Sequence, residues 1–245
     1  MNPLTKALAA TVSSLVAFVA GGYLVPLALV AIALVSAATG GVARRLASVS
    51  LLLTLPIAVS VVLVSALTRA GTEVLVVLGP FDVTREGVDF AGQMLVRLFA
   101  ISTAIGLFSL TTDPRAFVFD LERRGLSPRF AFVAAATVEA VPAMVTRAGV
   151  IAAAQRSRGL DTEGSLRARL RGVLPLVGPV ILSSLTEVEE RSLALEVRAF
   201  GRPGVRHLLW WPPDTAVERV ARWLIVAALL VLVAVRLAGA WPPIP

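Results

Sequence analysis

The stretch ALAATVSSLVAFVAGGYLVPLALVAIALVSAATGGVA (residues 7–43) contains no charged residue. About 20 apolar residues are enough to cross the hydrocarbon core of a bilayer, so this run is too long for one helix. Gly21-Gly22 and Pro26 interrupt its middle, and we therefore expect two helices, over residues 4–20 and 24–42, that are joined by a tight turn.

A secretory signal peptide is the alternative interpretation of the first helix, because Lys6 precedes an apolar stretch that ends in small residues. The second apolar run, which follows at once, favours a retained hairpin. Three further spans are predicted in the rest of the chain. They lie over residues 46–68, with a kink at Pro56, over residues 92–111, with Arg97 as the one charge, and over residues 217–238.

The composition is that of a membrane protein. Hydrophobic residues make up 57% of the chain, and the mean hydropathy is +0.83, whereas a soluble domain has roughly 45–50% apolar residues. The net charge of +7 could indicate a nucleic-acid partner, but aromatic residues for base stacking make up only 6%. Basic residues beside apolar runs are explained by the positive-inside rule. We expect the lipid bilayer as a partner and no nucleic acid.

Residues that could carry catalysis or hold a metal are scarce. The chain has no cysteine and one histidine, His207, which excludes disulfides, thiolate catalysis and cysteine or multi-histidine zinc sites. His-Glu-x-x-His, Gly-x-Ser-x-Gly and the phosphate-binding loop motif are all missing from the sequence. We therefore predict a protein that is not an enzyme and that has no cofactor and no metal site.

Residues 112–212 differ from the rest, because they hold more than half of the charged residues and still keep long apolar stretches. Helices are predicted over 113–124 and 128–158, where Asp113-Pro114 and Ser127-Pro128 supply N-caps and a proline at the first helical position. The second of these helices is expected to bend at Pro142. A third helix is predicted over 166–200, broken near Pro175 and Pro179.

These helices could cross the membrane or lie in water. A membrane position would bring several charges to bilayer depth, at about 2.5–3.5 kcal/mol for each one near a helix centre. Those charges are Glu139, Arg147, Glu187, Glu189, Glu190 and Arg191. A water-exposed module avoids this cost and is the preferred interpretation.

The expected fold class is an all-α integral membrane protein with about five transmembrane helices and a cytoplasmic module of long helices. Its predicted parts are a membrane domain over 1–111, the module over 112–212, and a last transmembrane helix with a tail over 213–245. The loop of residues 69–91 is rich in acidic residues, whereas Arg44-Arg45 and the module are basic. The positive-inside rule then places the N-terminus and the module in the cytoplasm of a multi-pass cell-membrane protein.

Two arginines end the long predicted helices. Arg158 follows Ala154 by four positions, and Arg198 follows Ala194 in the same way. An arginine in a last helical turn with glycine beyond it is ordinary C-terminal helix chemistry. That interpretation explains one such site readily, but it does not explain why the arrangement occurs twice, 40 residues apart.

Several short motifs in order carry a family resemblance over about residues 80–201. They are Thr84-Arg85-Glu86-Gly87, Thr111-Thr112-Asp113-Pro114, Leu121-Glu122, Leu126-Ser127-Pro128, Val141-Pro142, Ala154 to Gly159, Leu174-Pro175-Leu176 with Pro179, and Ala194 to Gly201. With this order, spacing and hydropathy, the chain resembles the transmembrane (T) component of energy-coupling factor ABC transporters, the group that includes cobalt/nickel and biotin transport permease subunits.

The resemblance implies a function in which the chain transmits ATP-driven motion of two ABC ATPase subunits to one small substrate-binding membrane subunit, for uptake of a vitamin or a transition-metal ion. It assigns ATPase coupling to the two helix ends: Ala154, Ser157, Arg158, Gly159, Ala194, Arg198, Ala199 and Gly201. It also suggests that Leu185, Val188 and Leu195 pack on the substrate-binding subunit. These three residues share a face from Ile181 onward, and packing within the chain itself is the other explanation for that face.

The second motif departs from the family pattern, because Val197-Arg198-Ala199 has no glycine until Gly201. Two other functions are considered. A membrane enzyme would need a catalytic cluster, and a polytopic scaffold or channel would work without ATPase coupling.

Overall fold

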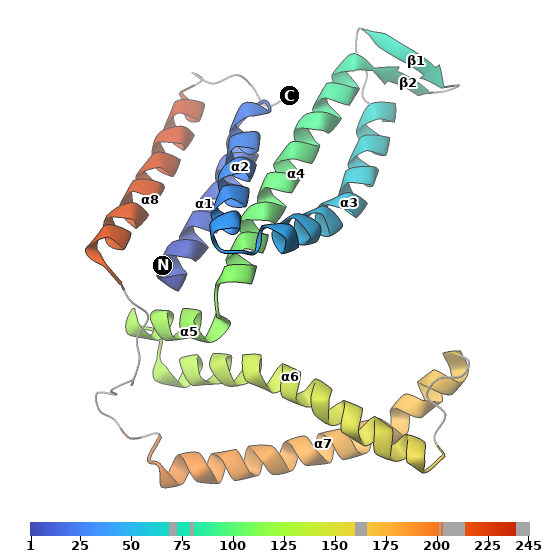
Figure 1. Ribbon diagram of the computed structural model, residues 1–245, viewed down its shortest axis with the longest axis vertical. Coiled ribbons are helices and arrows are strands. Elements are labelled where there is room, and N and C mark those ends of the chain that lie inside the picture. Colours follow the sequence, from blue (N-terminus) through green and yellow to red (C-terminus); the bar gives the residue numbers. More distant parts are fainter. Residues whose placement is uncertain (69–72, 79–80, 160–165, 201, 203–213, 239–245) are drawn as a thin grey trace. The chain divides into compact units, whose positions relative to one another are not determined.

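The computed structural model describes residues 1–68, 73–78, 81–159, 166–200, 202 and 214–238 (Figure 1). In these residues the fold is all-α, as the sequence predicts, with the addition of one small β-hairpin. The chain forms two compact units. The membrane unit consists of Met1–Leu121 with Pro212–Pro245, and the two-helix unit is Glu122–Trp211.

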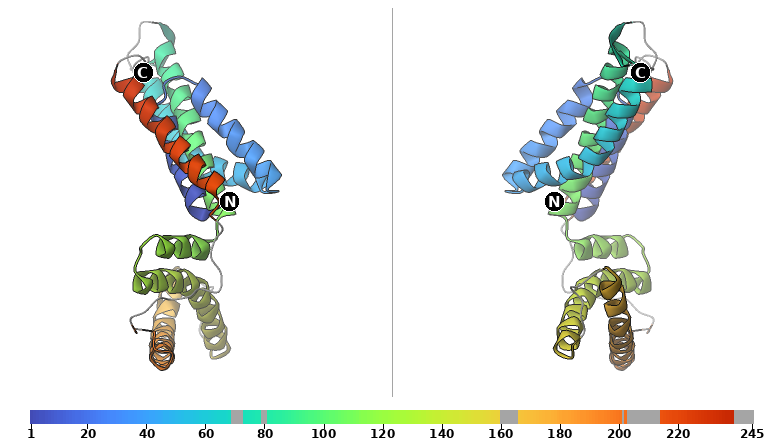
Figure 2. Two further views of the ribbon diagram at one scale, coloured as in Figure 1. Left: turned by 90° about the vertical axis from the view of Figure 1, so that its left-hand side faces the viewer. Right: turned by 90° about the vertical axis from the view of Figure 1, so that its right-hand side faces the viewer.

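Each apolar span predicted for the membrane unit is a helix. The helices are α1 (Pro3–Val19), α2 (Leu24–Thr39), α3 (Ala43–Thr68), α4 (Arg85–Thr111) and α8 (Ala216–Leu237). Helix α4 is central, because α1, α2 and α3 all pack against it, while α8 packs on α1 (Figure 2). Pro56 lies inside α3 without ending it.

Three helices in the described residues are long and apolar enough to cross a membrane. Two of them, α3 and α4, lie in the membrane unit, and the third is α6 (Pro128–Ser157) of the two-helix unit. Helices α1 and α2 have 17 and 16 residues, slightly fewer than the roughly 20 of a full crossing. The chain is therefore a multi-pass membrane protein, and the count of five spans stays a prediction.

The segment before α4 contains structure that the sequence analysis took for loop. Strands β1 (Val74–Leu78) and β2 (Phe81–Thr84) form an antiparallel hairpin. Thr84 then caps α4, because its hydroxyl accepts a hydrogen bond from the Gly87 N–H at 3.2 Å. Helix α4 consequently begins seven residues before the predicted apolar span.

The turn between α1 and α2 is tied to the start of α4. The Tyr23 hydroxyl donates to Asp89 Oδ1 at 2.8 Å, and burial, followed by this hydrogen bond, raises the pKa of Tyr23 to about 12. Gly92 is needed there because a Cβ atom at its position would lie 2.6 Å from the Tyr23 hydroxyl oxygen.

The membrane unit packs small and polar residues inside and leaves large apolar ones outside. Ala17, Ala37 and Thr103 are fully buried, whereas Leu52 of α3 is 72% exposed. This arrangement suits lipid, where close helix packing depends on small residues and a large aliphatic side chain loses nothing by facing the acyl chains. Arg97 of α4 is 3% exposed, and its Nε and one terminal nitrogen have no hydrogen-bond partner among the described residues.

Buried polar contacts join α1, α8 and the short helix α5 (Pro114–Arg123). The Asn2 side chain donates to Asp120 Oδ1 at 3.1 Å. Arg222 of α8 donates to the Thr5 hydroxyl at 2.9 Å and forms an ion pair with Asp214 at 2.8 Å. Desolvated hydrogen bonds of this kind hold the ends of these helices in one arrangement.

The two-helix unit consists mainly of α6 and α7 (Leu166–Val197). The predicted caps before α5 and α6 are confirmed, since Asp113 accepts from the Arg115 N–H at 3.0 Å and Ser127 from the Phe130 N–H at 3.5 Å. The predicted break near Pro175 and Pro179 is wrong, because α7 runs through both prolines as one helix. Its first turns run in a different direction from the rest (Figure 1), so the prolines bend α7 and do not end it.

Candidate functional site at the ends of the long helices

Helix α6 ends in a glycine cap. Ser157 is its last residue, and the Ser157 hydroxyl donates to the Ala153 carbonyl at 3.1 Å. Arg158 is the C-cap residue, and Gly159 follows with a φ of +91°. The Gly159 N–H donates to the Arg156 carbonyl at 2.9 Å. Glycine adopts this left-handed conformation at no steric cost, so the chain leaves the helix directly after the arginine.

Helix α7 ends in the same way but with alanine in the glycine position. Ala199 has a φ of +53° and is the one non-glycine residue with positive φ in the described part of the chain. Its N–H donates to the Glu196 carbonyl at 2.9 Å, and the Phe200 N–H donates to the Leu195 carbonyl at 3.0 Å. The cap is thus at Ala199, and Gly201 lies outside the described residues. An alanine in this conformation costs about 1–2 kcal/mol relative to right-handed backbone.

Both arginine side chains are exposed. Among the described residues, neither the Arg158 nor the Arg198 guanidinium has a hydrogen bond or ion pair. Arg156, two residues earlier, has an interaction within the chain. Ala154 and Ala194, one turn before each arginine, are also exposed and add little bulk, whereas the exposed Val197 directly precedes Arg198. Each helix end therefore presents an exposed guanidinium, beside small residues at the end of α6 and beside Val197 at the end of α7.

The two arginines lie at opposite ends of the two-helix unit, because α6 and α7 are antiparallel. The rings of Phe132 and Phe200 lie 4.7 Å apart between centroids, which brings the end of α7 to the start of α6. Further along, Arg147 of α6 pairs with Glu187 of α7 at 2.6 Å. Arg158 is 26 residues beyond Phe132, so at 1.5 Å per residue it lies roughly 40 Å from the Arg198 end.

Arg147 and Glu187 form a polar link between the two helices. Glu187 also accepts from Arg191, four residues along the same helix, at 2.6 Å. The hydrogen bond from Arg147 is the largest influence on the Glu187 carboxyl and lowers its pKa below the usual range. Sequence reasoning had counted these three charges as a cost of membrane insertion unless they were paired, and in the structure they pair.

The predicted apolar stripe of α7 is on the surface of the described unit. Leu185 is 55% exposed and Val188 is 64% exposed, while Leu195 is half-buried. Helix α6 exposes Phe130 and Val145 as well. Among the described side chains of the unit, the one buried apolar residue is Ala131 of α6. The described residues of the unit thus form two long helices with almost no buried apolar side chain between them.

The described residues contain no group of three or more His, Cys, Asp or Glu side chains that could hold a metal ion. The chemistry that the two described helix ends offer is recognition, since a guanidinium is a planar fork of donors that suits carboxylates and carbonyl oxygens of a partner.

Comparison with known proteins gives consistent matches. The sequence model of the family described as cobalt transport protein, CbiQ, matches residues 1–208. The chain is 34% identical over 168 residues to the energy-coupling factor transporter transmembrane protein EcfT of Heliobacterium modesticaldum, which covers 63% of each protein. It is 29% identical over 155 residues to EcfT of Bacillus subtilis, which covers 58% of this chain and 56% of that protein.

A further match is to a protein of Bifidobacterium longum that is described as an ABC transporter ATP-binding protein. The identity is 31% over 174 residues, which are 67% of this chain but 21% of that longer protein. The match thus spans just under two thirds of the Heliobacterium relative and about a fifth of the Bifidobacterium one.

Proposed function

The chain belongs to the CbiQ family of cobalt transport proteins, and from this membership we propose that it is the energy-coupling transmembrane subunit of an ABC importer. In this function the chain has no catalytic site of its own and transmits motion between partners. One observation carries the proposal most directly. Both long helices of the two-helix unit end in the same way, with an exposed arginine followed by a residue in the left-handed conformation. The two ends lie roughly 40 Å apart.

Two similar sites at opposite ends of one unit are suited to binding two partners of the same kind. We assign these partners as two ABC ATPase subunits, each of which receives one helix end. The similarity of this chain to part of a protein described as an ABC transporter ATP-binding protein supports an ATPase partner. The small residues Ala154, Ser157 and Gly159 at the first end, and Ala194 and Ala199 at the second, would let a partner surface approach each guanidinium closely. Gly201 is assigned to the same contact by the family resemblance alone.

The stripe of Leu185, Val188 and Leu195 is assigned to a third partner, a small substrate-binding membrane subunit. Leu185 and Val188 are more than half exposed on a charged helix, which favours a protein interface. That subunit would supply specificity for the imported compound, a vitamin or a transition-metal ion. Movement of α6 and α7 by the ATPases would then reach it through this face.

The membrane unit is the anchor in this proposal. Its polar contacts between α1, α5 and α8 hold the point at which the chain passes from the membrane helices into the two-helix unit. The excess of basic residues at Arg44-Arg45 and in residues 112–212 supports a cytoplasmic position for the two-helix unit.

The proposal is tested by replacing both arginines. The double variant Arg158→Ala/Arg198→Ala should lose the ATPase subunits and transport while it still inserts into the membrane at the wild-type level. Each replacement should cost about 2–5 kcal/mol of binding, because it leaves partner groups buried without a charge to meet them. The measurement is co-purification of the ATPases from membranes, normalised to the amount of this chain.

Arg202→Ala is the matched control, since Arg202 is an exposed arginine four residues beyond Arg198 and should change binding little. If the arginines only cap their helices, the double variant should lose at most about 0.3–1 kcal/mol of helix stability per site and keep its ATPases. Retained ATPase binding would favour the second candidate function, a membrane scaffold or channel without ATPase coupling.

A further inference from the structure

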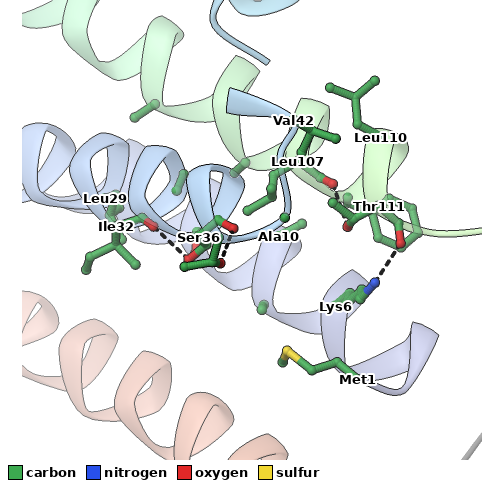
Figure 3. A pocket seen from close by; sticks show the side chains of 18 residues that line it. Met1, Lys6, Ala10, Leu29, Ile32, Ser36, Val42, Leu107, Leu110 and Thr111 are labelled. Atoms are coloured by element: carbon green, nitrogen blue, oxygen red, sulfur yellow. Dashed lines mark hydrogen bonds between the residues drawn. The ribbon is translucent and has the colours of Figure 1, made fainter. Parts of the chain in front are cut away.

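A cavity of about 640 Å³ opens between α1, α2 and α4 of the membrane unit (Figure 3). It exists because the facing positions carry short side chains, among them Ala10, Ser13, Ala33 and Ala104. Leu29, Ile32, Leu107 and Phe108 complete an apolar wall. The cavity lies within the range of about 300–1,000 Å³ that is typical of small-molecule sites.

One end of this cavity is basic. Lys6 is the single residue with a charged side chain among the described residues that line it, and its ammonium donates to the Thr111 carbonyl at 2.6 Å (Figure 3). An ammonium has three donors, so two remain for a ligand. Val42 lines the same end, and the exposed Arg44 and Arg45 follow it on the first turn of α3. This end of the apolar cavity therefore has a cation in its lining and two more shortly after Val42 in the chain.

The length of the cavity matches one leaflet of a bilayer. Along α4 it runs from Ala100 to Thr111, and along α2 from Leu29 to Gly40. At 1.5 Å per residue each of these wall segments is about 17 Å long, close to half of the roughly 30 Å hydrocarbon thickness. The basic end is the end at which α2 and α4 finish, where lipid headgroups lie.

The size of the cavity suits a single acyl chain. An unbranched methylene chain is about 4 Å thick at carbon contact distances, so it can lie along the apolar wall within a volume of about 640 Å³.

We propose that this cavity is a binding site for an anionic phospholipid, with an acyl chain between α1, α2 and α4 and the phosphate at Lys6. The apolar wall receives the chain, and the cations at the open end select a negative headgroup. The site is separate from the helix ends at Arg158 and Arg198, so the double alanine variant at those positions should keep its lipid.

Native mass spectrometry of the full chain tests this site. The protein is released from micelles that hold equal amounts of phosphatidylglycerol and phosphatidylcholine. The wild-type protein should retain about five times as much phosphatidylglycerol as phosphatidylcholine. This ratio corresponds to the roughly 1 kcal/mol that a basic residue contributes at an anionic surface. Lys6→Gln should bring the ratio close to one, while Arg219→Gln, which removes an exposed charge from the first turn of α8, should leave it unchanged.

Filling the cavity is the second test. Ser36→Phe places a large ring at an exposed lining position and should displace both lipids. Ala38→Phe places the same ring on α2 outside the lining and should leave both bound. A wild-type lipid ratio in Lys6→Gln, or full lipid retention in a folded Ser36→Phe variant, would overturn the proposal. So would release of a co-purified membrane subunit by Ser36→Phe with lipid still bound, because the cavity would then receive a protein.

Discussion

The membrane unit and the two-helix unit both consist of long helices, but they differ in which side chains they bury and which they expose. In the membrane unit, polar groups such as Asn2, Thr5 and Asp120 are buried and hydrogen-bonded, while leucines of α3 face outward. In the two-helix unit, charged and large apolar side chains share the surface, and Ala131 is the one buried apolar residue among those described.

The difference indicates what each unit needs around it. Outward-facing leucines in the membrane unit are covered by lipid, so its helices gain their fixed arrangement from small residues and buried polar contacts. The described residues of the two-helix unit form no comparable core, and Leu185 and Val188 are exposed on a charged helix, as residues at a protein interface are. Its stable form is therefore expected in contact with partners, as in the proposed coupling function.

The largest effect is expected at the polar contacts of the membrane unit. Arg222→Leu would remove the ion pair between Arg222 and Asp214, whose side chains are 10% and 11% exposed. Removal of one partner from a buried pair costs about 3–5 kcal/mol. Unfolding of the purified protein by heat or denaturing detergent should show this loss. Arg219→Leu, at an exposed position one turn earlier, is the control, and equal stability of the two variants would contradict a structural role for the pair.

In the two-helix unit, replacing an apolar residue by a charged one should affect partner binding and not stability. Val188→Asp places a charge at a position that is 64% exposed, so the unfolding free energy should change by less than about 0.5 kcal/mol. Binding of the substrate-binding subunit should instead weaken by about 2 kcal/mol or more, since the carboxylate would be desolvated in the interface. Co-purification of that subunit, measured beside thermal stability, checks both. Aggregation of the variant on extraction would show that the stripe belongs to the core of this protein.

The last turns of α6 and α7 should differ in local stability by about 1 kcal/mol, because one is followed by Gly159 and the other by Ala199. Exchanging glycine and alanine at these two positions should reverse the difference. Ala199→Gly relieves the left-handed strain at the end of α7, and Gly159→Ala introduces it at the end of α6, where the added Cβ meets no atom within 4 Å. The last turn of α7 should gain, and that of α6 lose, about 1 kcal/mol of local stability. Amide hydrogen exchange in the two last turns measures this, and unchanged protection at both ends would rule out the strain.

The smallest effect is a pH dependence of the contact between α6 and α7. The pKa of Glu187 is lowered in the folded protein from its usual value of 4.5, chiefly by the hydrogen bond from Arg147. The stabilisation is therefore fully present above about pH 4.5 and is lost as the pH falls through the lowered pKa. Spin labels on cysteines introduced at Met144 and Glu190, both exposed, should move apart in that range. The same labels with Glu187→Gln should show no such titration.

Local patterns predicted most of the helices. The uncharged runs, the caps at Asp113 and Ser127 and the arginines at the helix ends each depend on neighbours within a few residues, and these are the features that a sequence displays directly. The prediction at Pro175 and Pro179 was wrong, because a proline only weakens a helix locally. Whether the helix then ends or bends depends on the residues around it, and α7 continues through both prolines.

The sequence by itself determined a multi-pass all-α protein, its family and the two arginine positions, because hydropathy, capping and motif order are properties of nearby residues. Only the tertiary structure decided which distant groups meet. The pairs Arg222 with Asp214 and Thr5, Arg147 with Glu187, and Phe132 with Phe200 depend on the packing of helices far apart in the chain. The cavity with Lys6 at its open end and the left-handed Ala199 arise in the same way, from backbone paths that no local pattern specifies.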